Sequence, residues 1–470
     1  MGNNTSAEDS VPDDDAIYER EASESYARYG LKRGAPIDTK RVAAAIDDFG
    51  WNLLAKLETR RKNEGITSGC IAVSPVALAT VLSSLAAGIM HGSPAGEEIS
   101  DALQLPVMYA ECLEAVGDNM RQAVASGDAR AVLWMPMGLW ANSTLRPDFV
   151  EFVNDSLGVE AKRMVDTSSH GVNLWCADRS DGAISTIIPD GTKTNYCALT
   201  SGLHFCGQWA TGFHPSKSTR SVFNITGARR QKQQIPCIMM HRTDQRLPYT
   251  EVWSSSAASR TNAVADPELA IIAPEGLVAQ IVELPYAQGY TNSSAFSAYF
   301  ILPAAAVPLS QLIAVLGHSP HRWRKWKTGL RPKCVQLSVP RFRMQSSSPV
   351  ISKELQSLGI DGVFNPGNDS TVLHGMSEDP GLMMEGVYHQ VLLTVPAAGR
   401  AATSAMGGGE NKVPCEWVVQ WQCVSWRKPP HDDICSVLPS LLNTHHTHAG
   451  DPHAEDPHAV RTPHAEDPHS

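Results

Sequence analysis

The sequence predicts an α+β protein built around a large mixed or antiparallel β-sheet. Apolar residues recur at helical spacing in the first hundred residues, and again at 309–316 and 352–358. Strand-like apolar runs dominate the second half of the chain, at 277–285, 298–303, 334–344, 388–395 and 417–424. Strands with interspersed helices and long connections are typical of this fold class.

The N-terminal part of the chain is expected to be helical. Apolar spacing predicts a helix over 42–57, and 71–103 is expected to form two helices. Ser74 is placed to cap the first of these two helices, with Pro75 in its opening turn. Residues 71–90 are uncharged and long enough to cross a bilayer. Their serines, threonine, proline and many alanines favour a helix buried on all sides instead.

A change of pattern marks the middle of the chain. The apolar run 131–140 predicts a buried strand, and Pro147 indicates the start of another helix. Residues 241–275 are polar and rich in Ser and Ala, and we expect a surface insertion there. The ends differ from this body: 1–37 is acidic and predicts a disordered arm, and 441–470 is a low-complexity His/Asp/Pro tail.

Composition excludes several classes of function. The chain has 470 residues, a net charge of −10 and only 19% charged residues. This balance argues against nucleic acid or anionic lipid as the main partner, since both need a positive excess. Ten scattered cysteines with no Cys-x-x-Cys pair favour free buried thiols, although an even count also permits disulfides. No hydrolase, phosphate-loop or zinc-protease motif occurs, so we expect no enzyme activity, cofactor or metal.

Signals for location conflict. The acidic N-terminus lacks the pattern of a secretory leader and begins with a Gly2 myristoylation pattern. Seven Asn-x-Ser/Thr sequons occur, where chance gives roughly two. Those inside the compact region are Asn142, Asn154, Asn224, Asn292 and Asn368. The sequons favour an extracellular glycoprotein, and the alternative is a cytoplasmic or, through Gly2, membrane-associated protein.

A basic cluster interleaves with tryptophans at 321–327. Its cations could bind a sulfated glycan: Arg322, Arg324, Lys325 and Lys327. The alternative is an amphipathic helix that turns Trp323 and Trp326 to the core.

Short motifs occur in a constant order along the chain. They are Ile71-Ala72-Val73-Ser74-Pro75, Ala95-Gly96-Glu97-Glu98-Ile99, Val172-Asn173-Leu174-Trp175, Phe205-Cys206-Gly207-Gln208-Trp209, Glu283-Leu284-Pro285-Tyr286, Val339-Pro340-Arg341-Phe342 and Leu373-His374-Gly375-Met376-Ser377. In order and spacing, roughly 43–438 resembles the serpin family of serine protease inhibitors, and 38–440 is expected to form one serpin-like domain. The resemblance implies three β-sheets with eight or nine helices.

The resemblance also implies a mechanism and its residues. A target protease cuts an exposed reactive loop, which then inserts into the central sheet as a new strand and distorts the trapped protease. By similarity, Ser74, Ser201 and His389 lie where the sheet opens, with Ser201 in place of the usual Asn. Trp209 corresponds to the breach at the end of that sheet. The expected partner is a protease or another protein ligand.

The reactive-loop hinge departs from the family pattern at its first inward side chain. The hinge begins at Gly399 and keeps small residues at Ala401, Ala402, Thr403, Ser404 and Ala405. Arg400 stands where the family places Thr. Burial of an unpaired guanidinium costs several kcal/mol. The resemblance therefore implies that this member is not a suicide inhibitor.

The loop is also short. Only 15 residues lead from Gly399 to Pro414. An inserted strand of about 12 residues, or about 40 Å, would use 400–411 and leave almost no bait. Counting from either end gives different scissile bonds, and Lys412 is the only basic candidate outside the hinge. We expect a protein that acts by surface binding; the alternative is a serine or cysteine protease inhibitor that uses 400–413.

Overall fold

The computed structural model describes residues 14–66, 70–125, 131–164, 168–226, 232–255, 263–274, 276–287, 296–346, 350–367, 371–395 and 418–422. The chain divides into two compact units, Met1–Ser425 and Trp426–Ser470. All described residues belong to the first unit.

Ten α-helices lie in the described part of the chain. They are α1 (Asp14–Arg28), α2 (Thr39–Asn63), α3 (Pro75–Ala87), α4 (Pro94–Leu103), α5 (Ala110–Ala125), α6 (Pro147–Leu157), α7 (Ser169–Arg179), α8 (Leu309–His318), α9 (His321–Lys327) and α10 (Ser352–Ser357). The helices expected at 42–57, within 71–103 and from Pro147 are therefore present.

The uncharged stretch 71–90 forms a buried helix, as predicted. The Ser74 side chain caps α3 by accepting from the Ala77 amide, and Pro75 occupies the first turn. Side chains from Val76 to Ala86 are buried around the whole helix. In the part of the chain that the structure describes, no helix is long and apolar enough to span a membrane.

One mixed sheet has six strands. They are β1 (Ala131–Trp134), β2 (Met137–Ala141), β3 (Glu160–Arg163), β4 (Cys197–Gly207), β11 (Phe342–Gln345) and β12 (Met384–Val395). The order is β11-β12-β4-β2-β3, with β1 also on β4. The expected single strand over 131–140 is two strands, because Pro136 interrupts it and cannot donate to a ladder.

The other sheet has seven strands. They are β5 (Ser218–Thr226), β6 (Lys232–Trp253), β7 (Val264–Ala265), β8 (Leu277–Pro285), β9 (Ser297–Pro303), β10 (Arg331–Pro340) and β13 (Val418–Gln422). The order is β10-β6-β8-β9-β13, and β5 and β7 also pair with β6. Because β6 is 22 residues long, it joins strands along its whole length into one hydrogen-bonded network.

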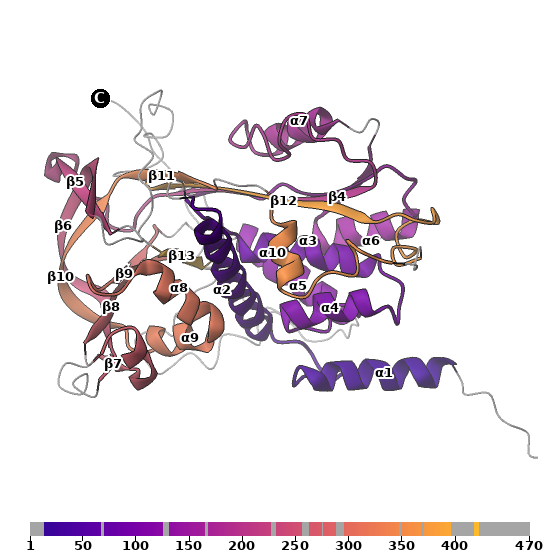
Figure 1. Cartoon of the computed structure of the whole chain (residues 1–470), viewed down its shortest axis with the longest axis horizontal. Helices are drawn as coiled ribbons and strands as arrows, with labels where there is room; N and C mark the ends of the chain where they lie inside the picture. Colours follow the sequence, from indigo (N-terminus) through magenta and orange to yellow (C-terminus); the bar gives the residue numbers. More distant parts are fainter. Residues whose placement is uncertain are drawn as a thin grey trace, which may run out of the picture. The chain divides into compact units, whose positions relative to one another are not determined.

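Helices cover both faces of the six-stranded sheet. Figure 1 shows α7 on one side of β4 and β12, with α3, α6 and α10 on the other. The largest core cluster joins α3, α5 and α6 to β2 and β4 through residues such as Leu82, Val116 and Leu199. A smaller cluster packs Val172 and Cys176 of α7 against the outer face.

Two predictions about the surface are wrong. Residues 14–37 of the expected disordered arm form α1 and an ordered connection to α2. Ala22, Tyr26 and Tyr29 lie at helical spacing and are buried, which the acidic composition concealed. The expected insertion 241–275 begins inside β6, whose residues to Trp253 pair with β10 and β8. Polar side chains suit this strand because its outward face meets solvent.

Candidate functional site

The candidate site is the junction between β4 and β12. These strands begin 187 residues apart in sequence and pair in parallel, from Met384 opposite Cys197 to Thr394 opposite Cys206. His389 stands opposite Ser201, in the middle of this ladder. The two strands are direct neighbours in the six-stranded sheet. A new central strand could enter only if this ladder opened.

The structure brings together the three residues that the sequence places at the opening region. The Ser74 amide donates to His389 Nε2 at 2.8 Å. Since Nε2 accepts, the proton of the neutral ring lies on Nδ1, which donates to the Ser201 carbonyl at 3.0 Å. His389 thus ties the start of α3 to both strands of the ladder.

Burial keeps His389 neutral. Desolvation lowers its pKa to about 4, against the opposing hydrogen bond to the Ser201 backbone. A second proton on the ring would occupy Nε2, which accepts from Ser74. Protonation would therefore break the link to α3 and leave a charge inside the sheet.

Ser346 is a member of this site that sequence reasoning missed. It follows β11, and its hydroxyl donates to the Ala72 carbonyl and accepts from the Val391 amide, both at 3.0 Å. Its own amide donates to the Val391 carbonyl. Ser346 therefore fastens β12 to the segment before α3. A serine at the end of a strand carries no sequence signal for this role.

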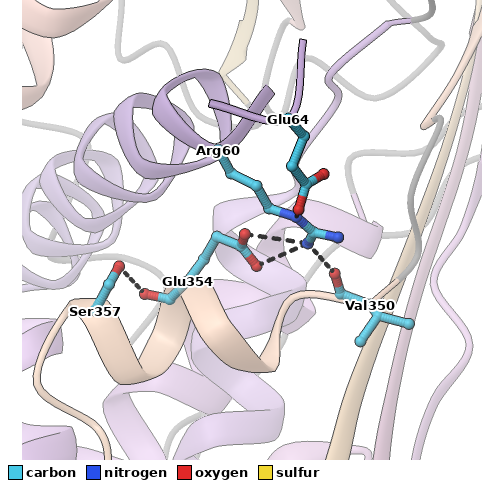
Figure 2. Close-up of polar contacts among 5 residues, drawn as sticks. All are labelled: Arg60, Glu64, Val350, Glu354 and Ser357. Atoms are coloured by element: carbon cyan, nitrogen blue, oxygen red, sulfur yellow. Dashed lines mark hydrogen bonds and ion pairs between the residues drawn. The ribbon is translucent and has the colours of Figure 1, made fainter. Parts of the chain in front are cut away.

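Arg60 fastens the same region to α2. Its guanidinium donates to the Val350 carbonyl and to the buried Glu354 of α10, both at 3.1 Å, and to Glu64 at 2.9 Å. Figure 2 shows these groups converging on Arg60 from α2, α10 and the approach to α10. Val350 also forms a bridge with Tyr388 of β12. Sequence reasoning did not select Arg60 or Glu354, since ion pairs across 294 residues leave no local pattern.

A small cavity lies beside these groups. Its volume is about 80 Å³, and side chains from the end of α2, from 70–73 and from Ser346, Ile351 and His389 line it. Most of its lining is apolar. It is smaller than the roughly 300 Å³ typical of a drug-sized ligand site.

Trp209 lies in the core between the ends of two strands. It follows β4, is 2% exposed, and stacks on Tyr286 with ring centroids 4.3 Å apart. Tyr286 follows β8 and forms a β-bridge with Trp209. The pair therefore joins the six-stranded sheet to the seven-stranded sheet.

The basic cluster forms α9, with both tryptophans fully buried. Arg322 donates to buried Asp266 at 2.5 Å and also pairs with Glu268, while Arg324 pairs with Asp48. Burial lowers the pKa of Lys327, although Asp47 opposes that shift. Lys325 is exposed. These carboxylates reduce the positive charge that α9 offers to a sulfated glycan.

Several predicted site residues lie outside the described residues. These are Gly2, Asn292, Asn368, the hinge from Gly399 to Ala405, and Lys412. Asn142 and Asn154 are exposed, and Asn224 lies in β5. Cys70, Cys112, Cys176, Cys197, Cys206 and Cys237 are free and buried, as predicted, whereas free Cys334 is exposed. Among the described residues, no group of three His, Cys, Asp or Glu side chains is placed to hold a metal.

Comparison with known proteins places this geometry among related folds. A family model described as Serpin (serine protease inhibitor) matches residues 44–429. Serine protease inhibitor A3N from Rattus norvegicus is 24% identical over 397 residues, covering 80% of this chain and 81% of the relative. Serine protease inhibitor 42Dd from Drosophila melanogaster is 25% identical, covering 76% and 84%.

Two solved structures illustrate the similarity in fold. Arabidopsis AtSerpin1 in its native stressed conformation has a TM-score of 0.60 at 19% identity, covering 80% of this chain and 88% of that one. Human thyroxine-binding globulin complexed with thyroxine has a TM-score of 0.61 at 20% identity, covering 77% and 87%.

Proposed function

This chain belongs to the serpin family, and from that premise we propose that it has lost suicide inhibition and acts by binding other molecules at its surface. Its fold is that of a serpin, with helices on both faces of a mixed central sheet. A fold alone does not determine which members inhibit proteases, so the proposal depends on this chain's own residues.

Arg400 is the observation that carries the proposal. An inserted loop would enter beside Thr394 and Cys206, where the β4–β12 ladder ends. Neither strand has a carboxylate at that end. Glu385 lies at the opposite end of β12, about 30 Å away at 3.3 Å per residue. A guanidinium at the entry point would find no carboxylate partner on either strand, so its burial there would cost several kcal/mol.

Loop length supports the same conclusion. The ladder from Met384 to Thr394 spans about 35 Å, which a matching strand covers with roughly eleven residues. β12 ends at Val395 and β13 begins at Val418. A strand that starts at Arg400 would use the loop almost to Lys412. Little chain then remains to present an uncut bond to a protease.

One specific observation favours the alternative, a working inhibitor of serine or cysteine proteases. β4 and β12 pair directly, so no strand occupies the position between them. An inhibitor needs this position empty before cleavage. The small hinge residues Ala401 and Ala402 would also fit an inserted strand.

The proposal extends to location. We place the protein outside the cell, as a glycoprotein, because Asn142 and Asn154 offer exposed sequon side chains. A carrier, a decoy and a structural protein are all compatible with this placement. Removal of N-linked glycans from native material should then increase its mobility on a gel, and no change would contradict the placement.

Adduct formation tests the loss of inhibition directly. The full chain is mixed with trypsin-, chymotrypsin- and elastase-like proteases and with a papain-like cysteine protease. We expect loop cleavage and no SDS-resistant adduct, because insertion is blocked before the acyl-enzyme can be distorted. A covalent adduct with any of these proteases would overturn the proposal.

A further inference from the structure

The N-terminal helix α1 lies outside the region that matches the family model. That match begins at residue 44, whereas α1 ends at Arg28. A short connection leads from α1 into α2, and α1 lies beside α4 (Figure 1). Tyr26 and Arg28 of α1 donate hydrogen bonds to α5 and α4. Residues 14–37 therefore add a further link between α2 and α5, beside the direct packing of these two helices in the core.

An aromatic contact anchors α1 to α5. Tyr26 is 1% exposed and packs against Tyr109, with ring centroids 5.5 Å apart. Its hydroxyl donates to Glu111 of α5 at 3.2 Å. Burial, together with Glu111, raises the pKa of Tyr26, so the phenol remains a neutral donor. Ala22 packs in the same cluster.

Charged contacts surround this anchor. Arg28 donates to Asp101 of α4 at 2.8 Å and also pairs with Glu97. The Arg33 guanidinium lies 5.9 Å from the centre of the Tyr109 ring. The Arg28 pairs are half exposed and contribute at most about 1 kcal/mol each, whereas the Tyr26 ring is buried.

α1 is connected to β12 through α2 and α10. Arg41 of α2 donates to the Tyr29 carbonyl at 2.7 Å, which joins α1 to α2. At the other end of α2, Arg60 holds Val350 and Glu354. The Ser352 hydroxyl of α10 then accepts from the Val387 amide of β12 at 3.0 Å. Movement of β12 is thus linked to α2.

α1 is connected to β4 through α5. Val116 of α5 and Leu199 of β4 lie in the same core cluster, so α5 packs on the β4 side of the sheet. α1 is therefore joined through α2 to the β12 side and through α5 to the β4 side. If α2 follows β12 and α5 follows β4, separation of the two strands shifts α2 relative to α5 and strains the contacts of α1.

We propose that α1 is a brace that restrains separation of β4 from β12, through Tyr26 and its contacts on α5. Detachment of α1 increases opening of the central ladder while the seven-stranded sheet stays closed. Any event that frees α1, such as proteolysis of the connection to α2, makes the sheet easier to open. This inference goes beyond the proposed function, since opening is a fluctuation of the sheet whether or not the loop can enter it.

Hydrogen exchange on the full chain tests the brace. We compare wild type with Tyr26→Ala, which removes the aromatic anchor, and Arg33→Ala, a milder variant that keeps the buried ring. The control is Arg20→Ala, since Arg20 is exposed on α1 and pairs only with Glu24 in the described chain. We expect amides of β12 and β4 to exchange at least tenfold faster in Tyr26→Ala, with a smaller increase in Arg33→Ala.

The remaining amides decide between a brace and a merely stabilising helix. For a brace, β8 and β9 exchange at the wild-type rate, and the Arg20→Ala control changes nothing in β12. Two outcomes would overturn the proposal: faster exchange confined to α1, or an equal increase in both sheets. Protease adducts play no part in this readout, so its failure is distinct from failure of the proposed function.

Discussion

His389 of β12 is hydrogen-bonded both to β4 and to the start of α3. Its two ring nitrogens are both used, one by the Ser74 amide and one by the Ser201 carbonyl. The ring is 1% exposed, and burial lowers its pKa to about 4. The folded protein therefore keeps the His389 ring neutral, whereas His389 of the unfolded chain would have a pKa near 6.5.

This difference predicts a loss of stability in mild acid. Between pH 6.5 and pH 4 the unfolded chain gains a proton at His389 that the folded chain refuses, so the free energy of unfolding falls as pH falls. The full effect is about 3 kcal/mol, reached near pH 4 and absent above pH 7. Urea unfolding of wild type and His389→Gln at several pH values measures it, because the variant lacks this proton site. Identical pH slopes for the two proteins would contradict the prediction.

At the scale of the element, α9 shows why a residue pattern can leave two interpretations open. Its sequence alternates basic and aromatic residues, which suits both a glycan site and an amphipathic helix. The structure buries Trp323 and Trp326 completely, and Trp323 contacts Trp51 of α2 at a centroid distance of 6.0 Å. The helix is therefore part of the core, and binding of a sulfated glycan stays a prediction.

Truncation of this helix's core face should be severe. Trp326→Ala removes a fully buried ring, and we expect a loss of about 3–5 kcal/mol in the free energy of unfolding. Lys325→Ala is the matched control, since the neighbouring side chain is exposed and should change stability by less than about 0.5 kcal/mol. Denaturant unfolding measures both variants. Equal free energies of unfolding for the two variants would show that Trp326 does not stabilise the core.

At the scale of the whole molecule, the closed ladder and the hinge oppose each other. β4 and β12 pair directly, so no strand lies between them. A sheet that accepts an inserted loop needs this position to be empty. Arg400 would be the first side chain to enter, and the nearer ends of β4 and β12 carry no carboxylate for it. The molecule would then remain in its closed form even after the loop is cut.

A nicked loop tests that balance. Lysyl endopeptidase is used to cut at Lys412, and thermal unfolding is followed before and after cleavage. We expect no rise in Tm for wild type and a clear rise for Arg400→Thr, because the variant removes a burial cost of several kcal/mol. Arg20→Ala, nicked in the same way, should behave like wild type. A rise in nicked wild type would show that the guanidinium is tolerated inside the sheet.

The sequence by itself determined the family, several of the helices and strands, and the buried nature of α3. Ordered motifs and apolar periodicity carried those predictions because they depend on residues close together in the chain. It also selected Ser74, Ser201 and His389, which the structure brings together across β4 and β12.

Only the tertiary structure decided the rest. Arg60 and Glu354 are 294 residues apart, and α1 is ordered because Tyr26 and Tyr29 meet partners on α5 and α4. The acidic composition of 1–37 predicted disorder. A helix with few apolar residues is stable only when neighbouring elements cover those residues, and composition does not reveal such neighbours. Local sequence patterns indicate which secondary structure a segment favours. Contacts between segments distant in sequence supply the free energy that stabilises that structure.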